Sequence, residues 1–284
     1  MFKKIFFAAA LLLASELGAK PVVIASIAPV EYLAKAVGGD KIEVQSLAKG
    51  DVHSYEPKPN DMKAVAKARI FIAAGLEFEE AWIPRFKASA KNLVVVKSDA
   101  KIAKLKEERG EQAEHDEKHE AHADPHVWLN PMLAITMARN ISDALIDIDK
   151  ANKDFYLENF QKLMNDLLAF DESAKESLAG LKNRKFVVYH PAWGYFAAHY
   201  DLEQISIERS GKEPKIDEMA STLKMIKDEN IKVIFADPNR SQKSAQILAS
   251  HTGAKVELLD PLGYNLLENL KIAVGAIKDA NSPK

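Results

Sequence analysis

Cysteine is absent from all 284 residues of the sequence. The chain therefore forms no disulfide bond and offers no thiolate to a metal ion, so a metal site would have to use histidine and carboxylate ligands. An anchor that is attached as a lipid on cysteine is excluded for the same reason. The composition predicts a free protein without covalent cross-links.

A strong charge of either sign is also missing, as is a long apolar run beyond the N-terminus. The 39 basic and 41 acidic residues give a net charge of −2, which does not favour binding to nucleic acid or to an acidic membrane surface. No later stretch approaches the roughly 18 apolar residues that a membrane-spanning helix needs. Because 47% of the residues are hydrophobic, we expect a soluble protein with a sizeable core.

The N-terminus has the pattern of a secretory signal peptide over residues 1–19. Lys3 and Lys4 precede the apolar run Ile5–Ala14, and small residues follow up to Ala19. The apolar run is too short to cross a bilayer, which favours a cleaved signal over the alternative of a short membrane anchor. We therefore predict that the mature protein is exported to the periplasm.

Short apolar runs alternate with helical patterns in two parts of the chain. The predicted strands are Val22–Ser26, Ile42–Leu47, Arg69–Ala74, Leu93–Val96, Lys185–Tyr189, Gln204–Ile207, Lys232–Ala236 and Lys255–Leu259. This alternation is typical of parallel α/β units. We predict an α/β protein with two lobes, residues 20–150 and 182–284, each containing a mostly parallel sheet.

Two segments interrupt this alternation. Residues 153–178 contain no proline or glycine and predict a helix roughly 40 Å long, within a linking segment 151–181. Residues 99–123 are rich in charged side chains and histidine and have almost no large apolar ones. Such a segment buries too little surface to offset its ordering entropy, so we predict a mobile loop within the first lobe.

Several histidine and aspartate side chains lie where parallel sheets bind their ligands, after the carboxyl ends of strands. The candidates are His53, His126, His190, Asp237 and Asp260. Neutral imidazole and carboxylate are both ligands of zinc, and three histidines with one carboxylate would complete a tetrahedron. The three histidines are far apart in sequence, so spacing alone leaves open whether they share a metal or are ordinary hydrogen-bonding residues at loop ends.

Four segments resemble the ligand motifs of the metal-binding subunits of ABC transporters. They are Gly50–Pro59 with His53, Asp124–Pro131 with His126, Tyr189–Phe196 with His190, and Leu259–Gly263 with Asp260. Their order and spacing match over essentially the whole mature chain. Within that family the sequence is most similar to the zinc-uptake, ZnuA-like group.

The resemblance implies a fold and a set of ligands. Two α/β lobes would be joined by one long rigid helix, with the metal between them, held by His53, His126 and His190. Histidine at the third position, where manganese-binding members usually have glutamate, favours Zn²⁺. Asp260 matches the carboxylate position of the fourth ligand, although water or a carboxylate of the first lobe takes that place in some zinc members. The implied partners are the membrane permease and ATPase subunits of an ABC transporter, and we expect a monomer.

Three further histidines, His115, His119 and His122, lie in the charged segment at helical spacing with His126. An auxiliary zinc-gathering site and a merely solvated charged loop are both compatible with this pattern.

Among whole-protein functions, the alternatives are a manganese-binding member of the same family, a zinc hydrolase and a surface adhesin. The sequence has no His-Glu-x-x-His motif, and Glu56 is the nearest candidate for a general base, so we predict a binding protein and not an enzyme.

Overall fold

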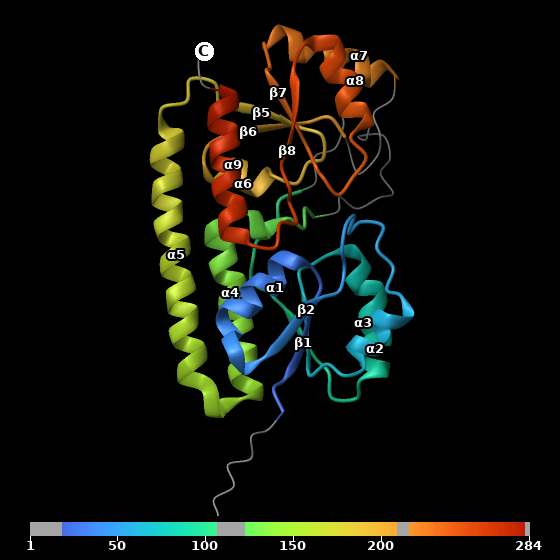
Figure 1. The fold of residues 1–284 in the computed structure, drawn as a ribbon, viewed down its shortest axis with the longest axis vertical. Coiled ribbons are helices and arrows are strands. Elements are labelled where there is room, and N and C mark those ends of the chain that lie inside the picture. Colours follow the sequence, from blue (N-terminus) through green and yellow to red (C-terminus); the bar gives the residue numbers. More distant parts are fainter. Residues whose placement is uncertain (1–18, 107–122, 209–215, 282–284) are drawn as a thin grey trace, which may run out of the picture.

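The computed structural model describes residues 19–106, 123–208 and 216–281 (Figure 1). In the first lobe the elements are β1 (Val22–Ala25), α1 (Ala28–Gly38), β2 (Glu43–Ser46), α2 (Pro59–Val65), β3 (Ile70–Ala73), α3 (Glu77–Ser89) and β4 (Val94–Lys97). Two helices follow, α4 (Pro131–Ile148) and α5 (Lys153–Ala179). In the second lobe they are β5 (Lys185–Val188), α6 (Gly194–His199), β6 (Glu203–Ser206), α7 (Ile216–Asp228), β7 (Val233–Ala236), α8 (Lys243–Thr252), β8 (Lys255–Leu258) and α9 (Leu266–Asn281).

Each lobe is built on a four-stranded sheet in which all strand pairs are parallel. The strand orders are β2-β1-β3-β4 and β6-β5-β7-β8, so the two sheets share one topology. The inner strands β3 and β7 are buried along their whole length, as expected for apolar runs covered by helices on both faces. The predicted α/β fold with two parallel sheets is thus confirmed.

Helix α5 runs along one side of both lobes (Figure 1). Its 27 residues pack against α1 and α4 on the first-lobe side and against α9 on the other. Its buried apolar positions recur every three or four residues, as one face of a helix requires. They are Tyr156, Phe160, Leu163, Leu167, Phe170, Ala174 and Leu178. The predicted long helix is therefore present, and it lies beside the lobes as a common support.

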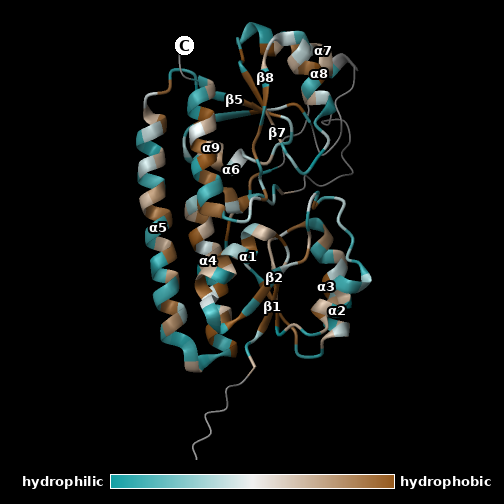
Figure 2. Cartoon of the chain, in the orientation of Figure 1, coloured by the Kyte–Doolittle hydropathy of each residue, from teal (hydrophilic) through white to brown (hydrophobic). Residues whose placement is uncertain are grey.

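One apolar core extends through both lobes (Figure 2). It includes Val23 and Phe71 of the first sheet together with Phe186 and Phe235 of the second. At its centre Trp128 is fully buried, and its indole N–H donates to the carbonyl of a second-lobe residue, Pro261, over 2.8 Å. This shared core holds the loops of the two lobes against each other. No helix among the described residues is long and apolar enough to cross a membrane.

Candidate metal centre

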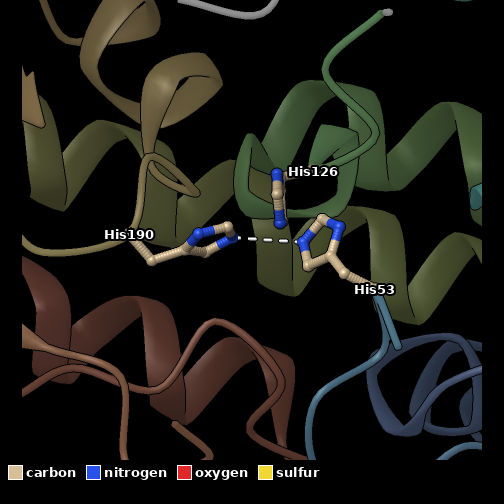
Figure 3. A group of neighbouring side chains, drawn as sticks. All are labelled: His53, His126 and His190. Carbon is tan, nitrogen blue, oxygen red and sulfur yellow. Dashed lines mark hydrogen bonds between the residues drawn. The ribbon is translucent and has the colours of Figure 1, made fainter. Parts of the chain in front are cut away.

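Three imidazole rings from three different loops meet between the lobes (Figure 3). His53 follows β2, His126 precedes α4, and His190 follows β5 at the carboxyl end of the second sheet. Their ring centroids are 4.9 to 5.7 Å apart, and one nitrogen of each ring lies within 4.8 Å of the others. The Nε2 atoms of His53 and His190 are 3.2 Å apart. Within the described part of the chain this is the one cluster of side chains with metal-ligand spacing.

Asp124 fixes the orientation of His126. Its Oδ1 accepts the backbone N–H of His126 over 2.9 Å and lies 2.7 Å from the ring Nδ1. Both residues are buried, at 6% and 4% exposure. Since the neighbouring carboxylate holds a proton on Nδ1, the Nε2 atom is left as an acceptor that faces the other two rings.

Local sequence explains why this segment is rigid. The Asn130 side chain caps α4 by accepting the backbone N–H groups of Met132 and Leu133, and Pro131 stands at the first helical position. A single turn of 3-10 helix, Val127–Leu129, joins His126 to that cap and is fully buried. The ligand loop is thus attached directly to the start of an 18-residue helix.

A tyrosine of the second lobe holds the same segment from the other side. The hydroxyl of Tyr195, in α6, accepts the backbone N–H of Leu105 and donates to the backbone carbonyl of Asp124, each over 2.8 Å. The Tyr195 side chain is therefore a link between the two lobes beside His126.

His190 also has a buried carboxylate behind it. Its Nδ1 lies 2.8 Å from Oε2 of Glu208, which is 4% exposed and follows β6. Nη1 of Arg240, in the loop after β7, lies 2.7 Å from the same oxygen and 2.5 Å from Nδ1. Nη2 of Arg240 lies 3.9 Å from Oδ2 of Asp51 in the first lobe. Glu208 and Arg240 were not predicted from the sequence, although both follow strands of the second sheet at the edge where His190 lies.

Asp51 in turn shapes the loop of His53. Its Oδ1 accepts the backbone N–H of His53 over 3.1 Å, and its Oδ2 accepts the hydroxyl of Ser54 over 3.2 Å. Further along, the Asp61 carboxylate accepts from the Tyr55 hydroxyl and from the backbone N–H of Lys58. These short-range bonds give the loop a defined path from β2 to α2.

The environment keeps His53 and His190 neutral at pH 7. His53 is exposed as a residue, yet its ring lies among the other two, and loss of hydration there lowers its pKa to about 4, with smaller effects from His126 and Arg240. Burial, followed by the same two neighbours and His53, lowers the pKa of His190 well below its ordinary value. Neutral imidazoles have free lone pairs at neutral pH, so the rings are ready to coordinate a cation.

The two predicted aspartates lie outside this cluster. Oδ1 of Asp260 accepts from the side-chain amide of Asn239 over 2.7 Å and from the backbone N–H of Leu262 over 2.9 Å, while Oδ2 makes no hydrogen bond within the described regions. Asp237 is hydrogen-bonded to Asn239, and burial raises its pKa. Neither carboxylate belongs to the group of ligand atoms formed by the three histidines. The loop histidines His115, His119 and His122 lie outside the described residues.

The fold and the cluster define a class: metal-binding proteins with two parallel α/β lobes and a histidine site between them. The sequence matches the family described as "ZnuA: Zinc-uptake complex component A periplasmic" over residues 23–280. The chain belongs to this family, whose members are non-enzymatic metal-binding transport proteins and serve as solute-binding components of metal ABC transporters. The resemblance drawn from the four motifs is confirmed, and the hydrolase alternative is excluded.

Individual relatives agree with this placement. The chain is 34% identical over 253 residues to a putative metal-binding protein of Treponema pallidum (strain Nichols), covering 86% of this chain and 80% of that one. It is 30% identical over 284 residues to the high-affinity zinc uptake system protein ZnuA of Bacillus subtilis (strain 168), covering 93% and 88%. A crystal structure of ZnuA superposes with a TM-score of 0.86 at 35% identity, covering 92% of this chain and 99% of that one.

Proposed function

We propose that this protein captures Zn²⁺ in the periplasm and delivers it, as a monomer, to the permease and ATPase subunits of an ABC transporter. The observation that carries the proposal is the convergence of three imidazoles, His53, His126 and His190, on one point between the lobes. Carboxylates behind two of the rings direct Nε2 towards that point. The family description and the signal-like N-terminus support the periplasmic location.

The donor set favours zinc over manganese. Imidazole is a ligand that suits zinc, whereas Mn²⁺ prefers carboxylate, carbonyl and water oxygens and is at the weak end of the divalent affinity order. All three members of the cluster are histidines, and no carboxylate joins them within the described parts of the chain. A manganese carrier of the same family is therefore the weaker alternative.

For the fourth position we retain Asp260 as the proposed ligand. It follows β8, and its Oδ2 makes no hydrogen bond with the described residues, while Oδ1 is held by Asn239 and Leu262. Binding would bring that oxygen to about 2.0–2.2 Å from the ion. Zinc held by residues of both lobes would bind the folded chain far better than the unfolded one, so zinc should stabilise the fold.

Titration of the metal-free protein with Zn²⁺ in the presence of a competing chelator tests the proposal. We expect one tight equivalent, which excess Mn²⁺ does not displace. A variant with His53, His126 and His190 all changed to Ala should lose that equivalent, whereas the matched control His251→Ala, at an exposed position of α8, should keep it. Unchanged zinc binding by the triple variant, or tight stoichiometric Mn²⁺ binding by the unaltered protein, would overturn the proposal.

A further inference from the structure

We propose that Glu208 and Arg240 act together as positioning residues, which tie the second-lobe ligand His190 to the first-lobe loop that carries His53. The inference rests on the proposed function, because it concerns how that site holds its ion. The carrying observation is a continuous chain of contacts, from the His190 ring through Glu208 and Arg240 to Asp51.

Glu208 performs the first part of this role by fixing the ring of His190. An imidazole can carry its proton on either nitrogen and can turn about its side-chain bonds, so an unsupported ring presents Nε2 only part of the time. The Glu208 carboxylate, 2.8 Å from Nδ1, accepts the Nδ1 proton when Nε2 binds zinc, and Arg240, whose Nη1 lies 2.5 Å from Nδ1, must then donate to Glu208 and not to the ring. Glu208 is buried and follows β6, whereas His190 follows β5. The packing of these two neighbouring strands in the second lobe therefore fixes the orientation of the ring.

Arg240 performs the second part by joining the lobes. One end of its guanidinium lies 2.7 Å from Glu208 and the other end 3.9 Å from Asp51, which itself accepts the backbone N–H of His53. The planar fork of arginine suits a bridge between two carboxylates, and a lysine has no second arm with which to make it. The side chains of Arg240 and Glu208 are 16% and 5% exposed, so this contact is shielded from solvent, whereas the Asp51 side chain is 31% exposed.

The same contacts reduce the electrostatic repulsion between Arg240 and an incoming zinc ion. A cation beside a zinc site repels the incoming ion, and Nη1 of Arg240 lies only 2.5 Å from Nδ1 of His190. The carboxylates of Glu208 and Asp51 each balance part of that positive charge. Removing Glu208 alone would therefore leave an unbalanced cation and should weaken zinc binding more than removing both partners.

A consequence for release follows from the place of Arg240. Separation of the His53 loop from His190 would open the site, and the contact between Arg240 and Asp51 would resist that separation. Loss of Arg240 should therefore raise the rate of zinc dissociation more than it changes the rate of association. Loss of Glu208 should act mainly on the His190 ring itself.

The test compares four variants with matched controls in the full protein: Glu208→Gln, Arg240→Gln, Arg240→Lys and the Glu208→Gln/Arg240→Gln double variant. Glu203→Gln, exposed on β6, and Arg139→Gln, on the surface of α4, are the controls. Zinc affinity is measured by chelator competition, and the dissociation rate by stopped flow into excess chelator. Nitrogen-15 NMR of the zinc-loaded protein reports the Nδ1 proton of His190.

We expect Glu208→Gln to weaken zinc binding about 10- to 100-fold and to expose the Nδ1 proton of His190 to exchange with water. Arg240→Gln should speed dissociation about 10-fold, Arg240→Lys should restore less than half of that loss, and the double variant should bind better than Glu208→Gln alone. If Glu208→Gln does not fold, Glu208→Asp, which keeps the charge on a shorter side chain, should show the same loss of proton protection.

Affinities and dissociation rates within twofold of the controls, with the Nδ1 proton still protected, would overturn the positioning role. That result is distinct from failure of the proposed function, in which the unaltered protein itself would not bind zinc.

Discussion

The hydroxyl of Tyr195 offers a sharp test of how the lobes hold the metal site. The change Tyr195→Phe removes one oxygen and keeps the ring in the core between the lobes. That oxygen satisfies two backbone groups, the N–H of Leu105 and the carbonyl of Asp124, over 2.8 Å each. The substitution therefore leaves two polar groups without their partner and creates almost no cavity.

The expected loss of stability depends on how well water can reach the Leu105 N–H and the Asp124 carbonyl. Asp124 is buried, so its unpaired carbonyl should cost about 1–3 kcal/mol, whereas Leu105 is 40% exposed, so water should reach its N–H and limit the loss to about 0.5–1 kcal/mol. We expect the free energy of unfolding to fall by about 1.5–4 kcal/mol. Because Asp124 orients His126, zinc affinity should also drop about tenfold.

Denaturant unfolding of the metal-free protein measures the first quantity, and chelator competition measures the second. Tyr264→Phe is the matched control, because Tyr264 is 48% exposed and its loss of a hydroxyl should change stability by less than about 0.5 kcal/mol. Equal stabilities of the two variants would refute the argument that Tyr195 links the lobes, and unchanged zinc affinity would refute its link to His126.

Four further predictions concern the ion, its ligands and the effect of pH. His190→Glu should shift preference towards harder ions, and competition between Zn²⁺ and Mn²⁺ should show the ratio of affinities moving towards manganese; an unchanged ratio would contradict it. At pH 6, zinc binding should release almost no protons from His53 and His190, because their lowered pKa values leave them neutral, and calorimetry in buffers of different ionisation enthalpy measures this release. The same shifts should destabilise the metal-free fold as pH falls from about 6.5 towards 4, where the unfolded histidines bind protons and the folded ones do not. Asp260→Ala should weaken zinc binding less than loss of any site histidine, since water can replace a carboxylate, and an equal loss would show that Asp260 is indispensable.

Most of the fold was predictable because its elements have simple apolar patterns. The run Ile70–Ala73 is short, apolar and completely buried as β3, and the buried face of α5 follows the helical period. Element ends were harder to place. Helix α2 begins at Pro59, where the Asp61 carboxylate folds back to accept the N–H of Lys58. Such a cap depends on side-chain geometry that periodicity does not contain.

The site was predictable only in part. Strand-end positions singled out His53, His126 and His190, but their convergence followed from the family resemblance and is seen directly only in the structure. Glu208 and Arg240 gave no motif, because their contacts join residues 18 to 189 positions away in the chain. Pairings of this kind depend on how separate loops pack at one sheet edge, and no local pattern encodes them.

The central claim, that the three histidines hold zinc, is tested most directly by anomalous diffraction at the zinc edge from crystals of the zinc-loaded protein. The account predicts one strong peak between the lobes, with Nε2 of His53, His126 and His190 each about 2.0–2.1 Å from it. A peak elsewhere, or one that lacks any of the three nitrogens within bonding distance, would contradict it.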